Sequence, residues 1–409
     1  MKITKGVQTV MASFAIQLVL GICYIWSVFQ TGIAESIFGG NHAAAALSFS
    51  LILLGLSIFS PVAGKLAAKY STRIVVFGGG LLISAGFFVA SMTTPEFPWL
   101  LWLSYGVMAG VGMGFTYSTT IALAQRWYPH RKGLVTAIIV SALGFGGVVF
   151  TPLVENWIAH FGGVGVGELP TFMVIGVIFL VVCSIGSIFL HTPPEVPKKA
   201  GSTAGAVTAS VKDYTASEML RNVKFYLIVT TMFLSVIGGL MMIGFARPIA
   251  VARGLEATAT IGVLAITMFN SFGRLFWGTL SDKLGRMNTI MILLIGSGLL
   301  SMSMTVVDGY WIYVVIGLIG FCFGGFLSTF PPLTADVFGV KNLATNYGFV
   351  LFGFGIGAVA ASQLGGFYQN LAREDISLMS PAFMIAAACA FVGLGLMLSL
   401  KVLVKKRGY

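Results

Sequence analysis

Residues 266–278 read Ile-Thr-Met-Phe-Asn-Ser-Phe-Gly-Arg-Leu-Phe-Trp-Gly, an apolar and aromatic stretch that contains one arginine, Arg274. With its flanks, from Ile261 to Arg286, the stretch is long enough to belong to a transmembrane helix. A guanidinium stays charged at physiological pH. A charge at the centre of a membrane helix costs at least ~3 kcal/mol on insertion scales, so this residue needs a compensating partner.

Arg274 has no acidic partner on its own segment. No carboxylate lies within two helical turns of it, and the residue one turn earlier is Asn270. The partner must therefore come from another helix, as a structural ion pair, or from outside the protein. We interpret Arg274 as the residue that binds an anionic substrate.

The composition is that of an integral membrane protein. The 409 residues are 57% hydrophobic and only 9% charged, whereas soluble domains have about 25% charged residues. This excludes a large soluble domain. The four cysteines show no C-x-x-C spacing and the four histidines no H-x-x-x-H pair, so we expect no metal site, no redox pair, no cofactor and no enzyme chemistry.

Apolar runs of the length that crosses a bilayer cover most of the chain. They predict an all-α membrane protein with transmembrane helices at about 8–30, 43–67, 74–93, 98–125, 133–158, 169–190, 224–246, 256–278, 287–306, 311–335, 342–367 and 380–403. The longest hydrophilic gap, 191–222, is rich in Pro, Lys, Gly and Ser and is predicted to be a cytoplasmic linker. It separates two six-helix halves, 1–190 and 223–409.

The basic residues support this map. With both termini cytoplasmic, all of the 24 Lys and Arg residues lie in cytoplasmic segments except Arg247, Arg253, Arg274 and Arg373, as the positive-inside rule requires. The net charge of +11 then reflects membrane topology rather than nucleic-acid binding. The first apolar run is too long for a signal peptide. We therefore expect a multi-pass protein of the inner membrane with its first helix retained.

Short motifs recur in the two halves. Gly64, Leu66 and Lys69 after the second span correspond to Gly278, Leu280 and Lys283 after the eighth, and the Gly144 run of the fifth span corresponds to the Gly353 run of the eleventh. Two halves repeated in parallel predict an axis along the membrane normal, with the substrate site between them near the midplane.

The turn from Gly278 to Arg286 resembles the loop signature of the major facilitator superfamily. In the first-half copy, which ends at Arg73, Ala68 stands where the acidic residue, Asp282, is expected. We expect Asp282 and Arg286, together with Lys69 and Arg73 of the first copy, to control the conformational change. The resemblance implies a weaker latch in the first half.

Four further segments resemble the monocarboxylate transporter branch of this superfamily, and especially its bacterial oxalate–formate antiporter relatives. They are residues 21–27, Tyr117 with residues 126–133, residues 270–278, and residues 345–348. The resemblance implies the major facilitator fold, a substrate carboxylate on Arg274, and a pocket that includes Tyr117, Tyr24 and Trp26.

The departures from the antiporter pattern concern polarity. At the position of the antiporter's second cation, a lysine, this chain has Phe354; Phe323, Leu327 and Leu351 stand where the antiporter has amphipathic aromatic residues. These apolar residues predict a pocket wall suited to one carboxylate with a small apolar tail. Asn270 replaces an aspartate that serves proton coupling in animal monocarboxylate transporters, and it is expected to bind substrate with Arg274 and Tyr117.

These patterns predict a secondary active transporter of small monocarboxylates, such as lactate or pyruvate, that works by alternating access as a functional monomer. Its expected partners are the carboxylate anion, a proton moved in symport, and the lipid bilayer. An anion exchanger of the oxalate–formate type is the first alternative. A carboxylate sensor that does not transport is the second, although the linker carries no recognisable output domain.

Overall fold

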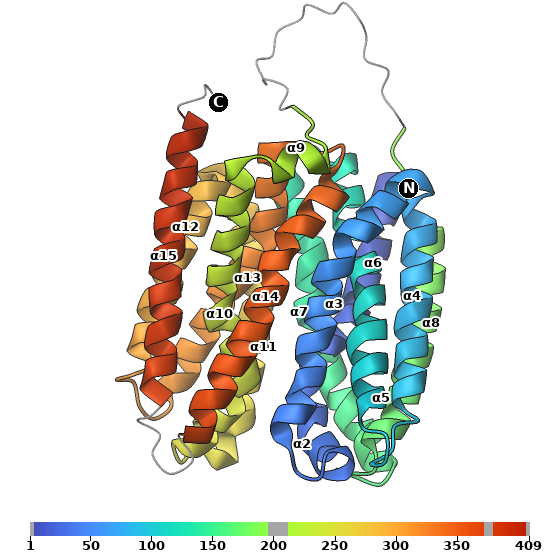
Figure 1. Cartoon of the computed structure of the whole chain (residues 1–409), viewed down its shortest axis with the longest axis vertical. Helices are drawn as coiled ribbons and strands as arrows, with labels where there is room; N and C mark the ends of the chain where they lie inside the picture. The colour runs from blue at the N-terminus through green and yellow to red at the C-terminus, as the bar shows by residue number, and fades with distance from the viewer. Residues whose placement is uncertain (1–3, 195–211, 372–378, 406–409) are drawn as a thin grey trace, which may run out of the picture.

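The computed structural model describes residues 4–194, 212–371 and 379–405, and in these ranges the regular structure is helical (Figure 1). The helices run in the order α1 (Lys5–Leu20), η1 (Gly21–Ile25), α2 (Trp26–Ile37), α3 (His42–Lys69), α4 (Thr72–Ala90), α5 (Trp99–Leu101), η2 (Trp102–Met108), α6 (Ala109–Trp127), α7 (Lys132–His160), α8 (Glu168–Ile188), α9 (Ala216–Leu220), α10 (Val223–Ala252), η3 (Glu256–Thr258), α11 (Ala259–Leu284), α12 (Arg286–Ser303), α13 (Trp311–Phe338), α14 (Leu343–Leu371) and α15 (Ser380–Lys405).

The long helices run roughly parallel and form two bundles side by side, α1 to α8 and α10 to α15 (Figure 1). Each predicted span corresponds to one long helix or, as in α1–η1–α2 and α5–η2–α6, to a continuous helical run. The bundles meet chiefly where α3 packs on α14 and α7 packs on α11. The two-bundle arrangement agrees with the architecture that the sequence predicts.

Eleven of the described helical stretches are long and apolar enough to cross a membrane by length and composition. The predicted eighth span is α11, which lies outside this set and contains Asn270 and Arg274. It packs between α7 and α13. A span whose polar residues face protein on both sides can tolerate lower hydropathy than a lipid-facing one.

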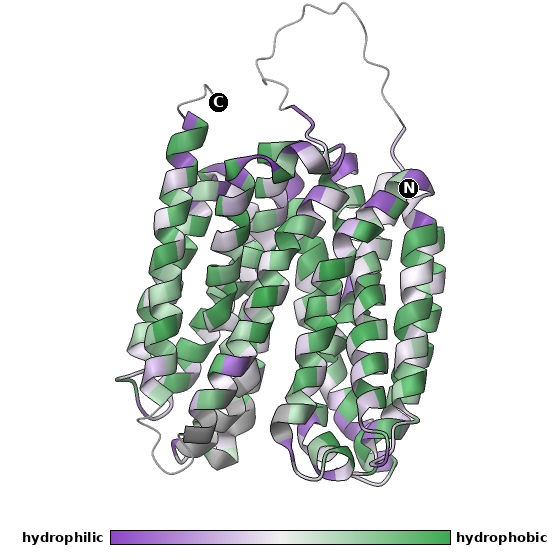
Figure 2. Ribbon diagram, viewed as in Figure 1, coloured by the Kyte–Doolittle hydropathy of each residue, from purple (hydrophilic) through white to green (hydrophobic). Residues whose placement is uncertain are grey.

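Hydropathy follows the long axis of the bundles. Apolar residues cover the middle of the helices, and hydrophilic residues are concentrated toward their ends (Figure 2). At one end, α3 and α11 finish and α7 and α14 begin, with Lys69, Lys132, Lys283 and Lys341 nearby. We call this the basic end; it is the cytoplasmic end under the predicted topology.

The predicted linker has an ordered last part, whereas its residues 195–211 lie outside the described ranges. Thr215 and Glu218 form a reciprocal capping box on α9. Lys212, at 2.8 Å, and then Thr215 lower the pKa of Glu218 to about 2. The Tyr214 amide donates to the Phe338 carbonyl at 2.9 Å, so this part of the linker is attached to the second bundle.

Candidate functional site

Arg274 is completely buried between the two bundles. Its Nε donates to Oδ1 of Asn270, one turn earlier on α11, at 2.9 Å. Its Nη1 donates to the backbone carbonyl of Val140 on α7 of the other bundle, at 2.6 Å. Within the described part of the chain, Nη2 has no well-aligned hydrogen-bond partner. One guanidinium nitrogen is therefore left with donors to offer.

Three tyrosines surround this cation. The guanidinium carbon lies 5.9 Å from the centroid of the Tyr24 ring, within the range of a cation–π interaction. Tyr117 of α6 and Tyr347 of α14 also lie within electrostatic range of Arg274 and beside each other. The Tyr347 hydroxyl is buried without a well-aligned partner among the described residues. The hydrogen-bond donors around the guanidinium thus come from both bundles: Tyr24 and Tyr117 from the first, and Tyr347 from the second.

A short 3-10 segment, η1, presents Tyr24. It interrupts the first span between α1 and α2. Just before Tyr24, Gly21 packs on the backbone of α7 at Leu143 and Gly146 so closely that a Cβ at Gly21 would overlap that backbone. Such 3-10 stretches inside longer helices often mark functional positions. Here the segment brings an aromatic hydroxyl toward the interface between the bundles.

In the described part of the chain, no acidic side chain neutralises Arg274. Among the described residues, the ion pairs involve Lys132, Lys212, Arg253 and Arg286, and Arg274 belongs to none of them. A buried charge without a counterion is strongly unfavourable unless something compensates it. The structural ion pair, which the sequence left open as an alternative, is absent from the described residues, and the site is chemically suited to a small anion.

The other predicted pocket residues differ in their surroundings. Leu351 and Phe354 are buried on α14, four and seven positions after Tyr347. That spacing puts all three on the same face of the helix. Phe323 and Leu327, one turn apart on α13, are also buried, and the Phe323 ring packs against Gly239 of α10.

Trp26 lies in a different environment. Its ring is 4.6 Å from that of Tyr105 and 6.3 Å from that of Phe29. These rings belong to an aromatic cluster inside the first bundle that also includes Phe87 and Phe172. The structure therefore places Trp26 in the core of its own bundle, and it places Asn270 against the Nε of Arg274.

Sequence reasoning did not select two of the groups around Arg274. Tyr347 could have been found, because it lies in the 345–348 motif and shares a helix face with Leu351 and Phe354. The Val140 carbonyl could not, because a backbone acceptor leaves no side-chain signal in the sequence. Only the packing of α7 on α11 brings it to the guanidinium.

Asp282 joins the two bundles at the basic end. Its carboxylate accepts hydrogen bonds from the amides of Gly133 (3.2 Å) and Leu134 (3.0 Å), in the first turn of α7. Arg286 pairs with the same carboxylate and lies 3.3 Å from Asp336, which also pairs with Lys132 at 3.0 Å. A carboxylate at a helix N-terminus is favoured both by the free amides and by the helix dipole.

The first-half copy of this motif is arranged differently. Lys69 lies over the ring of Tyr70 at 5.2 Å, and Arg73 is exposed. Neither is a member of an ion pair among the described residues. Ala68, at the position of Asp282, has no carboxylate to offer to the helix that faces it.

The described residues contain no cluster of three or more His, Cys, Asp or Glu side chains that could hold a metal ion. Cys23, Cys183, Cys322 and Cys389 are free thiols. The chemistry available near Arg274 is therefore that of hydrogen bonds, charge and aromatic rings.

Two helical bundles that enclose a buried cation at their interface have an architecture found in solute carriers. A sequence profile of the Major Facilitator Superfamily matches residues 9–362. The chain belongs to the major facilitator superfamily.

Known proteins support this assignment over nearly the whole chain. The chain is 32% identical to the uncharacterized MFS-type transporter YhjX of Escherichia coli, over 86% of this chain and 85% of that protein. It is 27% identical to the oxalate:formate antiporter of Oxalobacter formigenes, over 95% and 89% of the two chains. The crystal structure of the transporter FucP in its outward conformation matches with a TM-score of 0.69 at 15% identity, over 97% and 99% of the chains, which shows the common fold.

Proposed function

We propose that this protein is a secondary active transporter of small monocarboxylates, such as lactate or pyruvate, and that it works as a monomer in the inner membrane. The observation that carries the proposal is Arg274, a buried cation between the bundles whose Nη2 has no well-aligned hydrogen-bond partner and which has no counterion among the described residues. A carboxylate would accept charge-assisted hydrogen bonds from this guanidinium. Tyr117 and Tyr347 would add neutral ones.

The polarity of the surroundings favours one carboxylate over two. Phe354 and Leu351 lie on the same face of α14 as Tyr347 and carry no charge. A second carboxylate in this environment would have no second cation, and an unpaired buried charge is strongly unfavourable. A small apolar tail, in contrast, would gain free energy from contact with such a wall.

The proposed substrate also links the site to transport. The Nη1 of Arg274 bonds to the Val140 carbonyl of the other bundle, so a carboxylate that draws the guanidinium toward itself would compete with a contact between bundles. Alternating access requires such contacts to be exchanged during the cycle. We propose that the anion moves together with a proton, which keeps the transport of a monoanion electroneutral.

An anion exchange mechanism remains the second candidate, since a relative that spans 95% of this chain is named an oxalate:formate antiporter. Among the described residues, the buried carboxylate is that of Glu168. It accepts a hydrogen bond from the Gly165 amide at the start of α8, which is the end of the bundle away from the basic end. An exchanger needs no proton-carrying residue. A sensor that binds carboxylate without moving it would show binding but neither uptake nor counterflow.

The test is uptake of radiolabelled lactate, pyruvate and oxalate into proteoliposomes, with Arg274→Ala and Arg274→Lys beside the parent. Truncating one partner of a buried charge pair costs about 2–5 kcal/mol, so Arg274→Ala should weaken carboxylate binding at least ~30-fold. Arg274→Lys keeps the charge but loses the planar fork, and it should be impaired. Arg221→Ala, which removes an exposed arginine, is the matched control. Normal uptake by inserted, folded Arg274→Ala would refute the proposal.

A further inference from the structure

Two equivalent contacts join the bundles at the basic end. In one, Gly278 near the end of α11 lies against Gly133 in the first turn of α7. In the other, Gly64 near the end of α3 lies against Ala344 and Thr345 in the first turn of α14. A Cβ at Gly133 would overlap the Gly278 carbonyl, and a Cβ at Gly64 would overlap the backbone of Ala344 and Thr345. The close approach of a helix end to a helix start is repeated, but the side chains around the two contacts differ.

The difference lies in the helix N-termini. In α7, the second and third amides, those of Gly133 and Leu134, donate to Asp282. In α14, the second and third amides are those of Ala344 and Thr345, and no described acceptor binds them. Ala68 occupies the position of Asp282 in the repeated motif, so the N-terminus of α14 has no carboxylate from α3.

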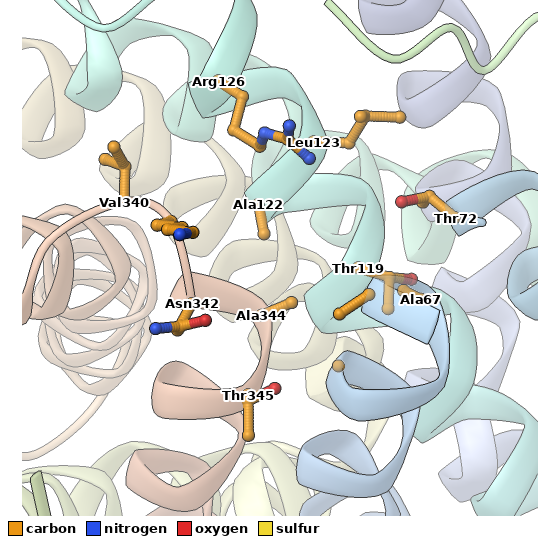
Figure 3. A pocket seen from close by; sticks show the side chains of 13 residues that line it. Ala67, Thr72, Thr119, Ala122, Leu123, Arg126, Val340, Asn342, Ala344 and Thr345 are labelled. Carbon is orange, nitrogen blue, oxygen red and sulfur yellow. The ribbon is translucent and has the colours of Figure 1, made fainter. Parts of the chain in front are cut away.

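A cavity of about 60 Å³ lies at this place (Figure 3). By the same measure one ordered water needs ~10–15 Å³, so the cavity can hold a small polyatomic ion. Its lining comes from α3, α4, α6, the loop before α14 and α14 itself, and includes Thr119, Arg126, Lys341 and Thr345. It contains two cationic residues and no acidic one.

Thr345 is a second, independent sign of a ligand. Its side chain lines the cavity (Figure 3). The residue is only 8% exposed. The hydroxyl makes no hydrogen bond to another described residue, unlike that of Thr119, which bonds to the Phe115 carbonyl at 2.6 Å. The hydroxyl of a largely buried residue, without a partner among the described residues, thus belongs to the same cavity lining as Ala344, whose amide has no described acceptor either.

A carboxylate beside the cavity lining, that of Asp213, serves another amide. Asp213 accepts a hydrogen bond from the Lys341 amide at 3.1 Å, before α14 begins, and it is not part of the cavity lining. At the equivalent contact, in contrast, Asp282 and Asp336 balance Lys132 and Arg286. The positive charge of Arg126 and Lys341 in the cavity is therefore unbalanced by its lining.

We propose that this cavity binds an oxyanion of the phosphate class, and that the anion replaces the missing carboxylate of Ala68 and holds α3 and α14 together at the basic end. Free amides and the dipole at a helix N-terminus favour such an anion, and Arg126, Lys341 and Thr345 supply further donors. The source is either free phosphate or the phosphate of an anionic lipid headgroup. The bound anion stabilises the conformation in which the basic end is closed.

The experiment measures the thermal unfolding midpoint of the purified protein. In detergent, inorganic phosphate is compared with chloride at matched ionic strength, and phosphate should raise Tm by at least about 2 °C. In nanodiscs without free phosphate, phosphatidylglycerol is compared with phosphatidylcholine. A rise with free phosphate indicates the soluble source, and a rise only with phosphatidylglycerol indicates the lipid. The absence of both rises would overturn the proposal.

Variants test whether the response belongs to this cavity. Ala68→Asp supplies the carboxylate within the chain, so it should raise Tm in chloride and abolish the anion response, while the uncharged Ala68→Asn should retain it. Arg126→Gln, alone and with Lys341→Gln, should reduce or abolish the response. Lys65→Gln removes an exposed charge of α3 outside the lining and should leave it unchanged. An equal response in the parent, Ala68→Asp and Arg126→Gln would overturn the proposal.

Discussion

The Nη1 of Arg274 donates a 2.6 Å hydrogen bond to the Val140 carbonyl, which joins the buried cation of the second bundle to the backbone of the first. Val140 lies eight residues after Lys132, the first residue of α7, so this contact is about 12 Å along the helix from the ion pair of Lys132 at the basic end. Among the described residues, the bundles are joined by polar contacts both at the site proposed for substrate and at the basic end, around Asp282 and Asp336. The proposed transport cycle requires that binding at the first influence the second.

Replacing Tyr347 with Phe should weaken substrate binding without unfolding the protein. The buried hydroxyl lies beside that of Tyr117 and has no well-aligned partner among the described residues, so its loss removes a group that is available to donate to the substrate. Hydrogen bonds to charged groups contribute about 1.5–3 kcal/mol, which corresponds to a ~10- to 150-fold rise in the half-saturation concentration for counterflow. Tyr313→Phe is the control, because that hydroxyl bonds to Thr258 at 2.8 Å, in the outer part of the second bundle. Unchanged half-saturation in Tyr347→Phe would exclude this role.

Phe354→Lys should shift the preference from monocarboxylates toward oxalate. The new ammonium would lie on the face of α14 that carries Tyr347, and it would provide the second cation that a dianion requires. Oxalate binding by the purified variant, measured by calorimetry, should become detectable while lactate or pyruvate binding weakens. Phe354→Leu, which changes the volume and adds no charge, should not gain oxalate binding. If Phe354→Lys binds oxalate no better than Phe354→Leu does, Phe354 is not the specificity residue.

Asp282→Asn should open the basic end more often. The amide keeps one acceptor for the α7 amides but loses the charge that Arg286 contacts. Loss of a helix cap costs ~0.5–2 kcal/mol, or a ~2- to 30-fold change in the closed-to-open ratio. A cysteine at Ser328, buried against Gly278, would report opening through faster reaction with a maleimide. Asp308→Asn, which removes the exposed partner of Arg253 in a loop, is the control, and equal labelling in both variants would contradict the latch.

Proton coupling predicts acidification of the vesicle lumen during substrate entry. A pH-sensitive dye is trapped in proteoliposomes, and an inward lactate or pyruvate gradient is imposed. Symport should acidify the lumen with no net dependence on an imposed potential. If the anion moved without a proton, one net charge would cross the membrane, and the imposed potential would change the free energy of transport by ~2.3 kcal/mol per 100 mV. Arg274→Ala vesicles should show no acidification. Counterflow in preloaded vesicles without acidification of empty ones would favour anion exchange.

Much of the architecture follows from patterns along the chain. Long apolar runs separated by short basic turns predict the transmembrane helices, because backbone groups in a bilayer must be bonded within a helix. The predicted starts and ends of α3, α7 and α13 lie close to the observed ones. Arg274 was also recognisable, since an arginine in an apolar span is conspicuous whatever surrounds it.

The surroundings of that arginine depended on tertiary structure. The spacing of residues did not show whether Arg274 has an acidic partner on another helix, or which hydroxyls approach it. Nor did it show that Trp26 packs on Tyr105 inside its own bundle. Periodicity assigns a residue to a face of its helix, but not to the helix that this face will meet. The open N-terminus of α14 likewise became visible only when α3 and α14 were brought together.

The sequence by itself determined the order of the long apolar helices and the presence of a cation, Arg274, within one of them, because both are set by local composition and its period. The tertiary structure decided the Val140 contact of Arg274, the group of three tyrosines, and the difference between the Asp282 contact and the cavity opposite Ala68. These depend on which atoms of distant segments come within hydrogen-bonding distance, and that is a property of packing.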